Sequence, residues 1–242
     1  MWAWLILLIA GAIYVVRWRR SGLTLIDFAG LSALHCYARL WHGWSSNGLA
    51  PIPARGPAIL VANHTSSADP ALVFNGCPRL VSFLMAAEYF QIAWARPLLN
   101  YLRCVPVARA GYEVGAVRLA LQLLSDGRIL GIFPEGNLSN AGRPRPRPGK
   151  AGCAYLALRS RAPVYPVRIE GGAQTSEVLP AWFLPTRQRV RITYGPALDL
   201  SAYYDRPITR KLLEEVRALI MRRIEELRGR GIPATRTARV SE

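Results

Sequence analysis

The sequence predicts an α/β domain with a mixed central sheet flanked by helices, preceded by an N-terminal membrane-associated helical hairpin. From residue 58 onward, short apolar and β-branched runs alternate with helical stretches, which is the pattern of a sheet covered by helices. Two long apolar segments rich in aromatic residues come before these runs. A chain of 242 residues is long enough for one such domain with appendages.

The N-terminal segment favours attachment to a membrane. Residues 1–16 are almost wholly apolar, and three arginines come next at Arg17, Arg19 and Arg20. This run is short for a bilayer span, which takes about 20 apolar residues. A signal peptide would carry its basic residues before the apolar run, and no small-residue cleavage site is seen. Since residues 23–44 continue with apolar side chains at helical spacing, we expect a hairpin on or in the membrane, with the arginines on the cytoplasmic side.

The remaining elements are predicted from local patterns. The expected strands cover 58–63, 80–85, 103–107, 128–133, 163–169 and 189–194. The expected helices cover 70–76, 88–100, 113–125 and 150–160, with an amphipathic helix at 209–228. Residues 45–57 are rich in Gly, Pro and Ser and are expected to form a linker. The expected divisions are N-terminal membrane-associated helices (1–44), an α/β domain (45–228) and a disordered tail (229–242).

The charge points to an anionic partner. Lys and Arg number 31 against 15 Asp and Glu, a net charge of +16, which attracts nucleic acid, acidic lipids or phosphorylated substrates. The arginines are spread along the chain, so we expect no nucleic-acid partner, although a non-catalytic basic scaffold on a membrane or lipid remains an alternative. The four cysteines are scattered without the paired spacing of zinc ligands, so we expect no metal site and reduced, partly buried thiols.

Residues suited to acid–base chemistry come directly after two of the expected strands. His64 and Asp69 come just after the first, and Phe133-Pro134-Glu135-Gly136 comes after another. A turn through residues 65–67 could bring the Asp69 carboxylate to the imidazole, fix its tautomer and leave the other ring nitrogen as a general base. Alternatively, Asp69 is only the cap of a helix that begins at Pro70. Since no Ser or Cys lies in a nucleophile motif, His64 would deprotonate a substrate hydroxyl directly.

These residues resemble the glycerolipid acyltransferases typified by 1-acylglycerol-3-phosphate acyltransferase. The HX4D motif of that family is matched by His64 and Asp69, with Asn63 before it. Its second block, a strand ending in arginine, is matched by residues 105–109. Its third is matched by Phe133-Pro134-Glu135-Gly136 and its fourth, an apolar strand with an internal proline, by residues 162–167. Order and spacing agree over about residues 58–170.

The resemblance implies roles for individual residues. The implied catalytic residues are His64 as general base and Asp69 as its partner, and the implied substrate-binding residues are Arg109, Glu135, Gly136 and Lys150. Arg109 would bind the acceptor phosphate, because guanidinium matches phosphate oxygens in a bidentate way. Glu135 would hold a glycerol hydroxyl or Arg109, and Lys150 would add a phosphate contact. The alternative for both cations is a solvated surface charge.

The resemblance also implies the reaction. A fatty acyl group would move from acyl-CoA or acyl-carrier protein to the sn-2 hydroxyl of 1-acylglycerol-3-phosphate, giving phosphatidic acid in phospholipid biosynthesis. No cofactor beyond this co-substrate is expected, since backbone N–H groups near a helix N-terminus can stabilise the oxyanion. The expected partners are membrane lipids, a lysophospholipid acceptor and the acyl donor. The expected location is the membrane, with the site facing the cytoplasm (the inner membrane in a bacterium).

One departure leaves the acceptor open. The family commonly continues the third block with Thr-Arg-Ser, whereas Asn137-Leu138-Ser139 stands here. The missing arginine removes a phosphate contact that Arg143, Arg145 or Arg147 could replace. Alternatively, the acceptor is another lyso-lipid, such as lyso-ornithine lipid.

Overall fold

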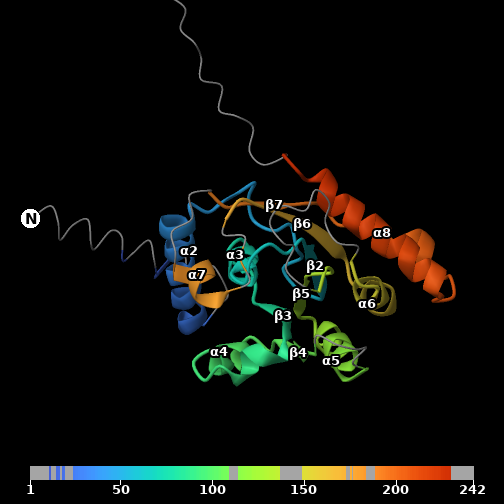
Figure 1. Ribbon diagram of the computed structural model, residues 1–242, viewed down its shortest axis with the longest axis horizontal. Coiled ribbons are helices and arrows are strands. Elements are labelled where there is room, and N and C mark those ends of the chain that lie inside the picture. Colours follow the sequence, from blue (N-terminus) through green and yellow to red (C-terminus); the bar gives the residue numbers. More distant parts are fainter. Residues whose placement is uncertain are drawn as a thin grey trace, which may run out of the picture.

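A central sheet lies between two layers of helices in the computed structural model (Figure 1). The structure describes residues 24–108, 114–136, 149–172, 175, 177–183 and 189–229, together with Gly11, Val15, Val16, Trp18 and Arg19. The part of residues 229–242 beyond Gly229, where a tail was expected, lies outside the described residues.

The seven strands of the sheet are ordered β1-β7-β6-β2-β5-β3-β4. They are β1 (Ser45–Ser46), β2 (Ala58–Ala62), β3 (Val81–Ala86), β4 (Val105–Val107), β5 (Ile129–Ile132), β6 (Val164–Glu170) and β7 (Arg191–Tyr194). All neighbouring pairs are parallel except β6 and β7, which are antiparallel. The expectation of a mixed central sheet flanked by helices is therefore confirmed.

The helices form two layers, each closing its own hydrophobic core. One layer holds α2 (Leu25–His42), α3 (Asp69–Phe74), α4 (Arg96–Tyr101) and α7 (Val178–Phe183), and the other holds α5 (Val114–Ser125), α6 (Gly152–Ser160) and α8 (Arg210–Glu226) (Figure 1). Two 3-10 turns complete the elements, η1 (Ala87–Gln91) and η2 (Ser201–Tyr203). In the central strand β2, Leu60 enters the first core while Ile59 and Val61 enter the second, because successive side chains of a strand point to opposite faces.

Helix α2 is part of the folded domain. Thr24 caps it by accepting a hydrogen bond from the Asp27 backbone N–H at 3.1 Å. One face packs on the first core through side chains that include the fully buried Ala38. Near its C-terminal end, the Tyr37 hydroxyl donates to the Trp182 carbonyl, which ties α2 to α7.

The hairpin expected at residues 1–44 is described mainly in its second arm. Most of residues 1–23 lie outside the described residues. Among the residues that the structure does describe, no helix combines the length and apolar character needed to cross a membrane.

Three local expectations differ from the structure. Residues 88–100 are not one helix, since η1 is followed by a separate α4 whose first turn holds Pro97, a residue that removes a backbone N–H and favours a helix start. The expected linker 45–57 contributes β1 to the sheet. Helix α7 was not expected at all.

Arg79 joins its own loop to two others at the amino ends of the parallel strands. Its guanidinium donates to the backbone carbonyls of Pro53 at 2.9 Å, Gly56 at 2.8 Å and Gly127 at 2.7 Å. These carbonyls belong to the segments that lead into β2 and β5, the two strands whose carboxyl ends lead to His64 and Glu135. One side chain thus holds the starts of both strands in place.

We expect Arg79→Met to destabilise the fold, because the thioether stem packs similarly but leaves the three carbonyls without their charged donor. Hydrogen bonds to charged groups contribute about 1.5–3 kcal/mol each, so a loss of about 2 kcal/mol or more in unfolding free energy is expected. Urea unfolding in detergent measures it. Arg55→Met, at an exposed arginine of the same region, is the control, and equal stability of the two variants would contradict the prediction.

Candidate active site

The two turns singled out in the sequence lie side by side at one edge of the sheet. Strands β2 and β5 are parallel neighbours, with Val61 opposite Ile132. The chain leaves β2 into a loop of residues 63–69 and leaves β5 into the turn 133–136. Because the carboxyl ends of parallel strands open onto the same edge of a sheet, residues far apart in sequence meet here, the usual place for a site in such sheets.

The loop after β2 holds His64 against Asp69. The His64 Nδ1 atom lies 2.9 Å from Asp69 Oδ2. The Asp69 side chain is 1% exposed and the His64 side chain 18% exposed, so the carboxylate is enclosed while the imidazole reaches the surface. A carboxylate accepts hydrogen bonds, so Nδ1 carries the proton and the neutral ring presents an unprotonated Nε2.

The loop is folded around the Asp69 carboxylate. Oδ2 also accepts the backbone N–H groups of Thr65 at 2.5 Å and Ser66 at 2.8 Å. Asp69 begins α3, yet it is not the cap of that helix, since its side chain bonds backward into the loop and the capping position belongs to Ala68. The interpretation of Asp69 as only a helix cap is therefore wrong.

The backbone N–H groups of residues 64–69 are taken up within the protein. Besides Thr65 and Ser66, the N–H of Ser67 donates to the Thr175 carbonyl, that of Ala68 to the Ser66 hydroxyl and that of Asp69 to the Ser66 carbonyl. The expectation that N–H groups near a helix N-terminus stabilise an oxyanion is not met at α3, because none of them points to an open acceptor position.

The turn after β5 holds His64 by its backbone and by its ring. Glu135, which is 4% exposed, accepts the His64 backbone N–H on Oε1 at 3.1 Å. The Phe133 ring stacks on the imidazole with centroids 4.1 Å apart and an interplanar angle of 20°. Phe83 of β3 stacks on Phe133 from behind at 5.8 Å. One face of the His64 ring is therefore held by an aromatic stack that no local sequence pattern had indicated.

Gly136 and Lys150 are brought together. Gly136 has φ +65°, and a Cβ added there would lie 2.5 Å from Lys150 Cε. The Lys150 backbone N–H donates to the Pro134 carbonyl at 2.6 Å. The glycine thus leaves room for the lysine stem to cross the turn, which places an exposed cation beside the third block.

Other predicted contributors cannot be placed. Arg109 lies outside the described residues, as do Asn137, Leu138 and the arginines at 143, 145 and 147. Across the described ranges, no three His, Cys, Asp or Glu side chains gather closely enough to hold a metal ion.

The three buried thiols are unsuited to act as nucleophiles here. Cys153 lies three residues beyond Lys150 and its thiol donates to the Lys150 carbonyl at 3.3 Å. Burial raises the pKa of the Cys153 thiol to about 12, so it stays protonated at neutral pH. Burial likewise raises the pKa values of Cys77 and Cys104.

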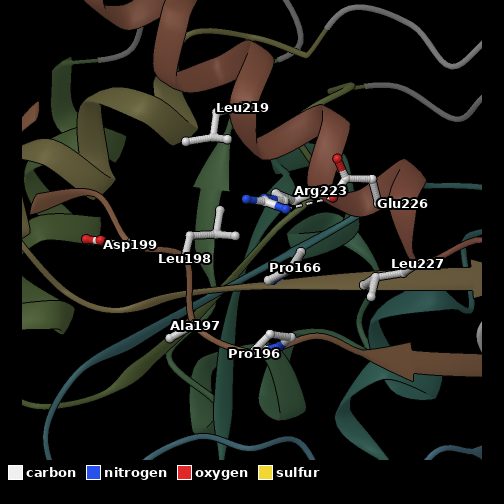
Figure 2. Close-up of a pocket in the computed structure, with 9 residues that line it drawn as sticks. All are labelled: Pro166, Pro196, Ala197, Leu198, Asp199, Leu219, Arg223, Glu226 and Leu227. Carbon is white, nitrogen blue, oxygen red and sulfur yellow. Dashed lines mark hydrogen bonds and ion pairs between the residues drawn. The ribbon is translucent and has the colours of Figure 1, made fainter. Parts of the chain in front are cut away.

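A separate cavity lies between α8 and the β6–β7 region (Figure 2). Its volume is about 310 Å³ and it has an apolar floor that includes Pro166, Leu198 and Leu227. Its lining contains neither His64 nor Asp69. We assign the chemistry to the β2–β5 edge, because the lining of this cavity contains no His or Cys and its Glu226 is paired with Arg223 at 2.9 Å.

Comparisons with known proteins identify a family and several relatives. Residues 45–170, just over half of the chain, match the family described as Acyltransferase. A Bacillus subtilis protein named 1-acyl-sn-glycerol-3-phosphate acyltransferase is 24% identical over 177 residues, which are 73% of this chain and 83% of that protein.

Two further similarities are informative. An Arabidopsis thaliana protein named N-acylphosphatidylethanolamine synthase is 35% identical over 128 residues, which are 48% of this chain and 43% of that protein. The crystal structure of a 1-acyl-sn-glycerophosphate acyltransferase from Thermotoga maritima superposes with a TM-score of 0.62 at 23% identity, covering 93% of this chain and 91% of that one. The latter establishes a shared fold.

We expect Asp69→Asn to destabilise the loop. A neutral amide cannot accept His64 Nδ1–H and two backbone N–H groups as strongly as the buried carboxylate does, and a loss of about 3 kcal/mol in unfolding free energy is expected. Chemical denaturation in detergent measures the loss. Asp205→Asn is the control, since Asp205 pairs with Arg161 at an exposed site, where such pairs contribute about 0–1 kcal/mol. A loss no larger than in the control would refute the account of the loop.

Proposed function

Since the chain belongs to the acyltransferase family, which includes the 1-acylglycerol-3-phosphate acyltransferases, we propose that it transfers a fatty acyl group from an acyl thioester to a lysophospholipid hydroxyl. The observation that carries this proposal is the pair of His64 and Asp69 at 2.9 Å, on the loop where a general base for such a transfer is required. The preferred acceptor is the sn-2 hydroxyl of 1-acylglycerol-3-phosphate, and the product is phosphatidic acid.

The proposed reaction needs one base and no covalent enzyme intermediate. His64 Nε2 removes the proton of the acceptor hydroxyl, while Asp69 stabilises the imidazolium that forms. The oxygen attacks the thioester carbonyl, and the tetrahedral intermediate expels the thiolate of coenzyme A or the carrier protein. His64 then gives this proton to the thiolate. The products are an ester and a thiol, and the imidazole is neutral again. No hydroxyl or thiol of the described residues is hydrogen-bonded to the His64 ring, which supports direct transfer to the substrate.

The acceptor headgroup is assigned from charge. Lys150 crosses the turn that carries Gly136, within the same edge of the sheet as His64, and suits a phosphate contact. Arg109, by the family resemblance, supplies the second contact. The buried Glu135 bonds the His64 backbone, so in this proposal it positions the base, and its expected contact with a glycerol hydroxyl is not needed.

A second class of acceptor has its own support. The relative named N-acylphosphatidylethanolamine synthase matches at 35% identity, and Asn137-Leu138 stands where the family commonly has Thr-Arg. An amine-bearing lipid, such as lyso-ornithine lipid or phosphatidylethanolamine, is therefore the alternative acceptor. In either case the same base would act on the nucleophile.

Attachment to the membrane is part of the proposal. Helix α2 leaves large apolar side chains at the surface, with Ile26 78% exposed and Leu40 85% exposed. Trp41 is also exposed, and tryptophan favours the membrane–water interface. The net charge of +16 adds attraction to anionic lipids of the cytoplasmic leaflet. We place the site at this cytoplasmic surface, where lysolipid and thioester donor meet.

His64→Ala is expected to reduce turnover by about 10²–10⁴-fold, the usual contribution of a general base. The variant removes one donor of the buried Asp69 carboxylate, so a loss of about 1.5–3 kcal/mol in unfolding free energy is expected. The protein is expected to remain folded and bound to membranes, because the His64 backbone N–H still bonds Glu135 and the backbone N–H groups of Thr65 and Ser66 still bond Asp69. The measurement is transfer of labelled oleate from oleoyl-CoA by purified protein in detergent. His35→Ala on α2 is the control and should retain most of the activity. A fully active His64→Ala protein would refute the proposal that His64 is the general base.

An acceptor panel is expected to give product with 1-acylglycerol-3-phosphate and none with glycerol-3-phosphate. The panel also holds lyso-ornithine lipid and phosphatidylethanolamine, each offered with oleoyl-CoA and, separately, with acyl-carrier protein as donor. If product forms only with the amine-bearing lipids, the proposed acceptor is wrong and the alternative acceptor is supported. A folded protein that yields no product with any pair would instead favour the non-catalytic scaffold.

A further inference from the structure

Where the backbone pairing of β2 with β6 stops, a side chain takes over the hydrogen bonding to β6. β2 ends at Ala62, which is opposite Val167, whereas its neighbour β6 continues to Glu170. The backbone groups of Ile169 on β6 therefore lie beyond the last paired residue of β2. They are met by Asn63, whose Nδ2 donates to the Ile169 carbonyl at 3.0 Å and whose Oδ1 accepts the Ile169 N–H at 2.7 Å.

A carboxamide can do this because it offers one acceptor and one donor side by side, as a peptide group does. Asn63 and Ile169 are 5% and 2% exposed, so either backbone group would be buried without a partner if the amide were absent. Since the side chain completes the ladder, the main chain is free to leave the sheet at residue 63. The next backbone N–H, that of His64, turns to Glu135 instead of to β6.

The same device occurs a second time in the chain. Asn47 comes directly after β1, and its Nδ2 donates to the Tyr194 carbonyl at 3.0 Å while Oδ1 accepts the Tyr194 N–H at 2.9 Å. The two amides make equivalent pairs of bonds to the neighbouring strand. They differ in burial, since Asn47 is exposed and Asn63 is buried. They also differ in the residues that come next, because Asn47 leads into a segment without site residues whereas Asn63 is directly followed by His64.

We propose that Asn63 is a positioning residue for the reaction: its amide replaces the β2 backbone against Ile169 and thereby sets the point and direction at which His64 leaves the sheet. This inference rests on the proposed function, in which His64 is the general base. The Asn63 amide bonds the Ile169 backbone, and it acts by fixing the Cα of His64 relative to Asp69 and Phe133.

The test compares Asn63→Ala with Asn47→Ala, because both variants lose the same two bonds. Misplacing a catalytic group by about 1 Å can cost about 10²-fold in rate. We therefore expect Asn63→Ala to lower kcat by about 10- to 100-fold while KM for the lysolipid and for oleoyl-CoA is unchanged. Asn47→Ala is expected to keep the kcat of the parent protein. Equal kcat values for the two variants would overturn the proposal.

A spectroscopic measurement separates this inference from the proposed function. In ¹⁵N-histidine-labelled protein, the Nδ1–H proton bonded to Asp69 gives a downfield NMR signal, assigned by its absence in His64→Ala. We expect Asn63→Ala to shift or abolish that signal and Asn47→Ala to leave it in place. An unshifted signal in Asn63→Ala overturns the inference even if His64 is catalytic. Loss of the signal alongside a fully active His64→Ala protein would instead show that Asn63 positions His64 and would contradict the proposed function, and with it the role of Asn63 in the reaction.

If Asn63→Ala does not fold, Asn63→Asp carries the same test. Its oxygen still accepts the Ile169 N–H, but an ionised carboxylate repels the Ile169 carbonyl, whereas a protonated one can donate to it as the amide does. The expected result is a kcat deficit, measured against the parent protein at each pH, that shrinks as the pH falls. A deficit independent of pH, or none at all, would overturn the proposal.

Discussion

The buried carboxylate of Asp69 is the constraint on which the site depends. A charge that is 1% exposed must be met by donors, since leaving it without partners in the interior would cost several kcal/mol. The donors are the His64 ring, the backbone N–H groups of Thr65 and Ser66, and the Thr65 hydroxyl, all supplied by the few residues before it. A loop with these requirements has few alternative conformations. The orientation of the imidazole is thus a consequence of satisfying a charge.

The sheet extends this local order to residues distant in sequence. Because β2 and β5 are parallel neighbours, Glu135 meets the His64 backbone although 71 residues separate them. Behind them, Gly131 lies in β5 against the Phe83 ring, where an added Cβ would lie 2.2 Å from the ring. The absence of a side chain there allows Phe83 to support Phe133, which in turn supports the imidazole. The geometry of the site therefore depends on the packing of the core beneath it.

The sequence predicted the parts of the fold that have strong local signals. The six expected strands coincide with β2 to β7 to within a few residues, since apolar β-branched runs bounded by turn residues mark buried strands. The two-residue β1 and the six-residue α7 carry too few residues for a period to appear. The break between η1 and α4 had a signal in Pro97, which the apolar pattern around it outweighed.

The candidate site shows the same division between local and distant information. The pairing of His64 with Asp69 lies within one turn and could be predicted from spacing and residue type. The contacts of Glu135 with the His64 backbone and of Asn63 with Ile169 join residues 71 and 106 positions apart, and no local pattern encodes them. Both use a polar side chain to satisfy a main-chain group, so they depend on strand register, which only the folded sheet defines. The precision of an acid–base site thus comes from side chains that perform no chemistry, and a short motif states which residues react but not what holds them in place.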